Sequence, residues 1–198
     1  MQVILKTIYR KSRFAIYENS LYFWSMRKHT GMRPHDIPIL VKAFMLQRDP
    51  WLIKDLATSV YISQSEVSES LHRSMYAELL DEQKQKVHPK RFYEFIIYGM
   101  RYVFPQKPGH LTRGMATAHS HPALQGKFIS NVKYVWPKEK GETLGHAVGP
   151  FYAKQVNACQ DDDELYFVLS LVEIIRVGKT REVNYAKEQL KKIFEVEK

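Results

Sequence analysis

Six polar side chains recur at the spacing of one helix face: Gln64, Ser65, Ser68, Glu69, His72 and Arg73. Residues three and four apart in a helix lie on the same side. These side chains donate and accept hydrogen bonds, and their lengths suit the base edges and phosphates of a DNA duplex. Such chemistry requires a helix whose first turn is exposed and whose opposite face is buried.

Ser63 marks the expected start of that helix, because it stands three residues before Glu66. In a capping box the serine oxygen accepts from the third backbone N–H of the helix, and the glutamate reaches back to the N–H of the serine. We therefore predict a helix from Gln64, with Val67 and Leu71 facing inward.

A shorter helix is expected just before it. Leu56, Ala57 and Val60 form its apolar stripe, and Ile62 in the connecting turn continues the same small core. Two helices joined by a tight turn are the arrangement that brings a second helix into the DNA major groove. The alternative is a small all-helical domain that contacts no nucleic acid.

The residues upstream predict one more helix. Ile37, Leu40 and Phe44 recur at helical spacing after Pro34, which suits a helix start. The chain then breaks at 49–50, because a proline ring disfavours helical geometry in the residue before it. Lys54 falls in the first turn of the following helix, where a cation can contact a phosphate.

Residues 34–90 resemble the winged helix-turn-helix regulators of the multiple-antibiotic-resistance-repressor (MarR) type, through Asp55–Ala57, Ile62–Ser65, Val67–Ser68 and Leu71. The resemblance implies a DNA-binding transcriptional regulator that reads two half-sites as a symmetric homodimer. It also implies a wing at residues 79–87, with Lys84 and Lys86 as candidate phosphate contacts. Tyr61 departs from the pattern, since it stands where a glycine is common in the turn.

Charge is unevenly distributed along the chain. The 198 residues carry a net charge of +9, but residues 1–33 hold +6 of it and the other 165 hold +3. Basicity favours an anionic partner such as nucleic acid. Glu66 and Glu69 nevertheless outweigh Arg73 in the predicted recognition helix, which favours a second hypothesis: a protein-interaction module built on a winged helix that does not bind DNA.

Composition places the chain among globular proteins of a reducing compartment. With 44% hydrophobic residues it can bury a sizeable core, and a single cysteine, Cys159, excludes an internal disulfide framework. No apolar run approaches the length that spans a membrane. We expect a cytoplasmic protein without a membrane partner.

The C-terminal region is expected to combine helices with a short strand. A helix should run from Pro89 to about Pro105, and residues 106–122 are predicted to be a long irregular segment. A strand at 133–137, a turn at 138–142 and two helices should follow, the first from about Glu164 after an acidic cap at 161–163 and the second after Gly178.

Histidines of the predicted irregular segment suggest a weaker hypothesis, that of a metal-dependent sensor or an enzyme. His119 and His121 could chelate a metal if extended, but no further ligand pattern accompanies them, and we interpret them as solvated loop histidines. No nucleophile, base and orienting acid occur in a catalytic arrangement. We predict no enzyme activity, no metal and no cofactor.

The sequence thus predicts a mainly α protein with a small β component. We expect a basic aromatic arm at 1–31, a winged helix-turn-helix domain at 32–104 and a mostly helical companion region at 105–198. The predicted function is DNA-binding transcription regulation, in which Lys54, Arg73, Lys84 and Lys86 engage phosphates. The base edges would be read in the major groove by Gln64, Ser65 and Ser68, while Glu69 and His72 complete the face. A small-molecule effector is left open.

Overall fold

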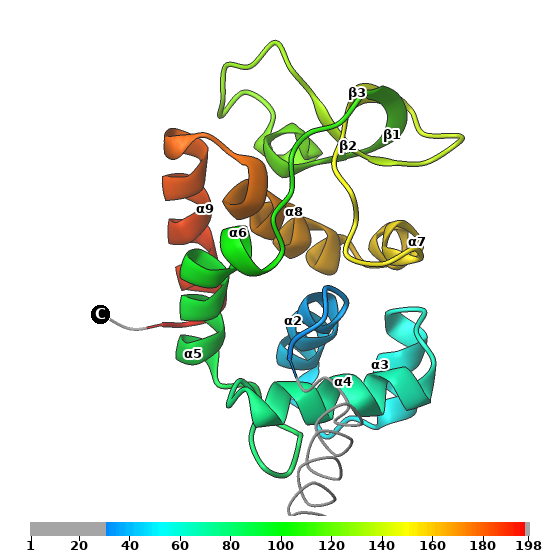
Figure 1. Ribbon diagram of the computed structural model, residues 1–198, viewed down its shortest axis with the longest axis vertical. Helices are drawn as coiled ribbons and strands as arrows, with labels where there is room; N and C mark the ends of the chain where they lie inside the picture. The colour runs from blue at the N-terminus through cyan, green and yellow to red at the C-terminus, as the bar shows by residue number, and fades with distance from the viewer. Residues whose placement is uncertain (1–30, 197–198) are drawn as a thin grey trace, which may run out of the picture. The chain divides into compact units, whose positions relative to one another are not determined.

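The computed structural model describes residues 31–196, which are drawn in colour in Figure 1. The predicted arm of residues 1–31 lies outside this range, except for Gly31. Among the helices of residues 31–196, none is both long and apolar enough to cross a bilayer.

The N-terminal part of this range forms the predicted succession of helix, helix, turn and helix. Helix α2 runs over Asp36–Leu46, α3 over Ile53–Ser59 and α4 over Gln64–Tyr76. Pro50 lies in the break between α2 and α3, as its restricted backbone predicts. The inward faces of the helices share buried side chains, among them Leu40, Leu56 and Val67, each without exposed surface.

A minimal hairpin follows α4 where a wing was predicted. Its two arms are joined by an isolated antiparallel bridge between Leu80 and Val87 rather than by paired strands of any length. The Asp81 carboxylate holds the tip, because its Oδ1 accepts from the backbone N–H groups of Gln85 at 2.7 Å and Lys86 at 3.0 Å. Lys84 adopts a φ of 58°, which supplies the sharp turn that a glycine usually provides.

A continuous helical segment then runs from Pro89 to Val103, as predicted. It consists of α5 (Pro89–Glu94), the π-helical η1 (Phe95–Gly99) and α6 (Met100–Val103). Gly99 permits a close approach of the Phe95 ring, since a Cβ there would lie 3.1 Å from that ring.

Three short strands form a small closed sheet: β1 (Leu111–Thr117), β2 (Tyr134–Pro137) and β3 (Thr143–Ala147). β1 pairs antiparallel with both others, while β2 and β3 pair in parallel. The prediction of an irregular segment at 106–122 is therefore wrong, because it contains β1 and the short 3₁₀ helices η2 (Ala118–Ser120) and η3 (Pro122–Leu124). The partners of β1 lie far along the chain, so local composition gave no sign of them.

The C-terminal helices are α7 (Gln155–Gln160), α8 (Asp163–Val177) and α9 (Thr180–Ile193). The predicted acidic cap of α8 is confirmed, since Asp162 Oδ1 accepts from the backbone N–H of Leu165 at 2.9 Å. α8 is buried on nearly every side because α2, α6, α7, α9 and η2 all pack against it (Figure 1).

Residues 31–196 are mainly α with a small β component, as predicted. Buried side chains from α2 to the end of α9 form one hydrophobic cluster, in which Ile37, Phe92, Leu169 and Phe194 are shielded from solvent. The predicted boundary between residues 104 and 105 falls inside this shared packing.

Candidate nucleic-acid interface

The first turn of α4 begins where the sequence predicts. The Oγ of Ser63 accepts from the backbone N–H of Glu66 at 3.3 Å, and Ser63 has an extended backbone that starts the helix at Gln64. Only this half of the predicted capping box forms. The Glu66 carboxylate turns instead toward the N-terminal end of α2.

Glu66 is the outer member of a charged cluster. Its Oε1 lies 2.8 Å from His35 Nε2 and 3.1 Å from Arg73 NH2. Partial burial by itself raises the pKa of Glu66, but the hydrogen bonds from Arg73 and His35 outweigh it and lower that pKa overall. Glu66 is therefore an anion whose charge is met within the protein.

Arg73 is buried, so the prediction that it lies on the outer face of α4 is wrong. Its residue surface is 5% exposed, and its Nε and NH2 bind Asp36 Oδ2 at 2.9 Å and Oδ1 at 2.6 Å. This two-pronged pair explains the placement, since a buried guanidinium is tolerated when a carboxylate matches its fork. The hydrogen bonds to Asp36 also raise the pKa of Arg73.

Asp36 is the buried carboxylate that holds the cluster in place. It is fully buried at the start of α2, and its Oδ2 also accepts from the backbone N–H of Arg33 at 2.7 Å. The pair with Arg73 therefore joins α2 to α4 at a defined position along both helices. This contact fixes the orientation of α4 relative to the helix behind it.

Arg33 is a cation of this site that was not predicted from the sequence. Its NH1 lies 3.4 Å from Glu66 Oε1, and its side chain is 41% exposed. The guanidinium thus stands beside the first turn of α4 and offsets the charge of Glu66. Sequence spacing gave no signal for it, because the two residues are 33 positions apart.

The outward face of α4 otherwise carries the predicted polar side chains. Gln64, Ser65 and His72 are exposed, while Ser68 and Glu69 are half-buried. The opposite face packs inward through Val67 and Leu71, as predicted.

The hairpin is linked to α4 through two residues of the predicted site. Lys84 Nζ lies 2.6 Å from His72 Nε2, and His72 Nδ1 lies 2.8 Å from the Ser68 carbonyl oxygen. A neutral imidazole with its proton on Nδ1 satisfies both contacts, since it donates to Ser68 and accepts from Lys84. Lys86 is exposed on the same hairpin, and Lys54 is exposed in the first turn of α3.

The turn between α3 and α4 contains an unusual backbone. Tyr61 adopts a φ of 56°, in the left-handed region that favours glycine, at the position where the regulator pattern has one. Its hydroxyl donates to Asp161 Oδ2, which raises the pKa of Tyr61. This contact with the segment before α8 offsets part of the conformational cost.

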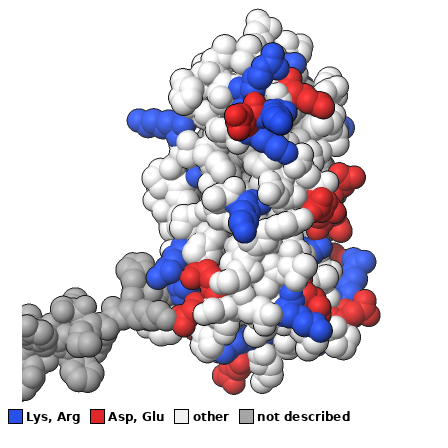
Figure 2. Space-filling model, turned by 90° about the vertical axis from the view of Figure 1, so that its right-hand side faces the viewer, with Lys and Arg blue, Asp and Glu red and all other residues white. Residues whose placement is uncertain are grey.

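Charge on the surface near α3 and α7 is mixed in sign. Figure 2 shows Lys and Arg side chains interspersed with Asp and Glu on the face it presents, with no continuous basic stripe there. On this face, cations that could meet phosphates are therefore separate side chains rather than a basic field.

Two histidines of the predicted irregular segment are buried, so their interpretation as solvated loop residues is wrong. His119 and His121 are 8% and 6% exposed. His119 Nε2 lies 2.8 Å from the Val132 carbonyl oxygen, and His121 Nδ1 accepts from the Ala123 N–H at 3.1 Å. Within residues 31–196 no group of three or more His, Cys, Asp or Glu residues could hold a metal ion.

Comparisons with known proteins add no family to this description. No protein-family model, curated protein or solved structure matches the chain.

Proposed function

We propose that this protein binds double-stranded DNA by inserting the first turn of α4 into the major groove. The observation that supports this most strongly is the combination of an exposed, serine-capped first turn with a buried anchor. A reading helix must present polar side chains outward while its orientation stays fixed. Ser63 sets where the helix starts, and the Asp36–Arg73 pair holds it against α2.

The roles of the side chains follow from their exposure. Gln64 and Ser65 are exposed in the first turn, with Ser68 one turn later, so these residues would meet base edges. Phosphate contacts would come from Lys54 of α3 and from Lys84 and Lys86 of the hairpin, which acts as a short wing. Arg33, which stands beside Glu66, would make the phosphate contact that the sequence predicted for Arg73.

In this proposal the protein is a cytoplasmic transcriptional regulator that acts as a homodimer. Two copies of α4 would then lie about 34 Å apart and read two half-sites of one operator. A palindromic sequence recovered by selection from random duplexes, with half-sites about one helical turn apart, would support this arrangement.

Fluorescence anisotropy with a labelled random duplex across a salt series tests the DNA contact directly. Each neutralised phosphate contributes about −0.9 to the slope of log affinity against log salt. The triple substitution Lys54→Ala, Lys84→Ala and Lys86→Ala should flatten that slope by about 2 to 3. The matched control is the triple alanine variant at Lys107, Lys133 and Lys179, which are exposed in the C-terminal part of the chain.

The base-reading role has its own test. The double substitution Gln64→Ala and Ser68→Ala should reduce discrimination between a selected site and random duplex, and it should leave the salt slope unchanged. If random-duplex binding is absent at low salt, or if the control triple variant loses as much slope as the test variant, the proposal is wrong.

The second candidate is a protein-interaction module, which the mixed charge on the face shown in Figure 2 favours. In that case α4 would meet a basic partner protein rather than a phosphate backbone. A duplex affinity that is undetectable at low salt, together with specific capture of a basic partner that Glu69→Lys abolishes, would support it.

A further inference from the structure

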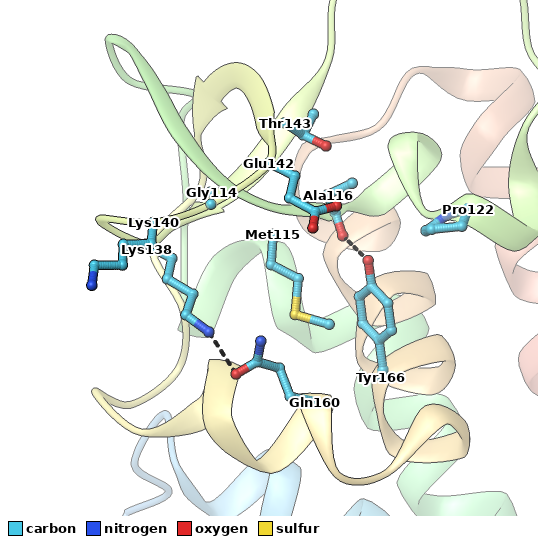
Figure 3. Close-up of a pocket in the computed structure, with 11 residues that line it drawn as sticks. Gly114, Met115, Ala116, Pro122, Lys138, Lys140, Glu142, Thr143, Gln160 and Tyr166 are labelled. Carbon is cyan, nitrogen blue, oxygen red and sulfur yellow. Dashed lines mark hydrogen bonds between the residues drawn. The ribbon is translucent and has the colours of Figure 1, made fainter.

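A small cavity lies in the C-terminal part of the structure, between β1, the turn joining β2 to β3, and the helices α7 and α8 (Figure 3). Its volume is about 270 Å³. Each water in the liquid takes about 30 Å³, so this space equals about nine waters. Leucine and methionine have about as many non-hydrogen atoms, so a molecule of that size matches the space. The side chains that define it are Met115, Lys138, Glu142, Gln160 and Tyr166.

Two glycines allow the β2–β3 turn to lie directly on β1. A Cβ on Gly141 would lie 2.3 Å from the Cα of Gly114, so no side chain fits between the two backbones. The turn is held by hydrogen bonds from Lys138 N to Arg113 O at 3.1 Å and from Gly141 N to Lys138 O at 2.9 Å. This close approach brings Lys138 and Glu142 to the cavity from opposite ends of one turn.

One end of the cavity offers hydrogen-bond donors. Lys138 Nζ donates to Gln160 Oε1 at 2.6 Å, which leaves further N–H donors on the ammonium group. The amide nitrogen of Gln160 points into the cavity (Figure 3). This end is therefore suited to a carboxylate.

The other end offers acceptors. The Glu142 carboxylate points toward the place where the Tyr166 hydroxyl donates to the Ala116 carbonyl oxygen (Figure 3). Neither Glu142 nor Lys138 forms a salt bridge with another residue in the part of the chain that the structure describes. Met115 lies between the two ends and presents an apolar side chain to the space.

We propose that this cavity binds a free apolar α-amino acid. Its ammonium group would meet Glu142 and the Ala116 carbonyl oxygen, its carboxylate would meet Lys138 and Gln160, and its side chain would lie against Met115. A zwitterion matches a site with an unpaired anion at one end and an available cation at the other. This inference does not depend on DNA binding by α4.

Isothermal titration calorimetry of the full chain, without DNA, tests the site with three probes. They are L-leucine, N-acetyl-L-leucine, which lacks the ammonium group, and L-leucinamide, which lacks the carboxylate. L-leucine should bind, and each blocked probe should bind at least about tenfold more weakly, because each loses one charge-assisted contact. L-methionine should bind like L-leucine.

Two substitutions assign the ends of the cavity. Glu142→Gln should weaken L-leucine while leaving N-acetyl-L-leucine unchanged, and Lys138→Met should weaken L-leucine while leaving L-leucinamide unchanged. Glu139→Gln and Lys140→Met are the matched controls. Glu139 does not line the cavity, and Lys140 lines it but its ammonium group points away in Figure 3, while methionine keeps an aliphatic side chain there. Far-ultraviolet circular dichroism should be the same for all four variants, because the altered side chains lie at the surface of the turn.

The inference is overturned if L-leucine and L-methionine both fail to bind at millimolar concentration. It is also overturned if both blocked probes bind as well as L-leucine, or if Lys140→Met weakens L-leucine as much as Lys138→Met does.

Discussion

Replacing Arg73 by methionine should remove a large part of the folding free energy, because the carboxylate of Asp36 would be left buried without its cation. Asp36 has no exposed surface, and the Arg73 side chain is 6% exposed, so water cannot take over the lost contacts. Removing one partner of a buried pair costs about 3–5 kcal/mol. The remaining hydrogen bond from Arg33 N to Asp36, at 2.7 Å, places the expected loss at the lower end, about 3 kcal/mol.

Urea unfolding followed by circular dichroism measures this loss, and a thermal scan should show a midpoint lowered by roughly 6–12 °C. Arg91→Met is the matched control, because Arg91 pairs with Glu78 at 3.0 Å with both side chains more than half exposed. That variant should lose no more than about 1 kcal/mol. The double variant Asp36→Asn with Arg73→Met should regain part of the loss, since no uncompensated charge stays buried.

An opposite outcome would refute the role of the buried pair. If Arg73→Met changed the free energy of unfolding by less than about 1 kcal/mol and instead reduced the salt dependence of DNA binding, Arg73 would be the phosphate contact that helical spacing alone predicts.

Further predictions concern the helix cap and two buried ionisable groups. Ser63→Ala should lower the free energy of unfolding by about 1 kcal/mol because Glu66 N loses its acceptor, whereas Ser65→Ala, at an exposed position, should change it little; urea unfolding compares them. Burial lowers the pKa of His121 to about 4, so the stability that its neutral form contributes is present above about pH 6.5 and lost as the pH falls. Between about pH 7 and about pH 5, the free energy of unfolding of His121→Asn should therefore fall by about 2 kcal/mol less than that of the natural chain. Equal losses would contradict this. Glu173 is fully buried in α8, with its Oε2 2.9 Å from Arg176 NH1. Burial raises the pKa of Glu173 to about 7 although Arg176 opposes the rise, so its contribution is greatest at low pH and declines as the pH rises through that value. Between about pH 5 and about pH 8, the free energy of unfolding of Glu173→Gln should fall by about 2–3 kcal/mol less than that of the natural chain. The same pH dependence in both proteins would show that the carboxyl stays ionised throughout.

Local sequence signals predicted several helix ends of this protein, whereas β1, β3 and α7 were not predicted. Ser63 with its following residues predicted the start of α4, the Asp49–Pro50 pair predicted the break before α3, and the acidic run before α8 predicted its cap. These signals act within three or four residues, because caps and proline constraints depend on neighbouring backbone groups.

Contacts between distant residues decided the rest. Glu66 forms half of the predicted capping box because His35 and Arg73 compete for its carboxylate. Arg73 itself stands at the spacing of an outward face, yet Asp36, 37 positions away, draws it inward. Helical periodicity predicts which residues lie on the same side of a helix. A charged side chain at the edge of that side can still point either toward solvent or toward the interior.

The sequence by itself therefore determined where α4 and α8 begin, that Gln64, Ser65 and His72 lie outward on α4, and that the fold is mainly α. Tertiary structure alone decided that Arg73 is an internal anchor, that β1 is a strand and that His119 and His121 are buried. The physical reason is the same in each case: a buried charge, a strand edge or an imidazole is stabilised by a partner, and these partners lie far along the chain.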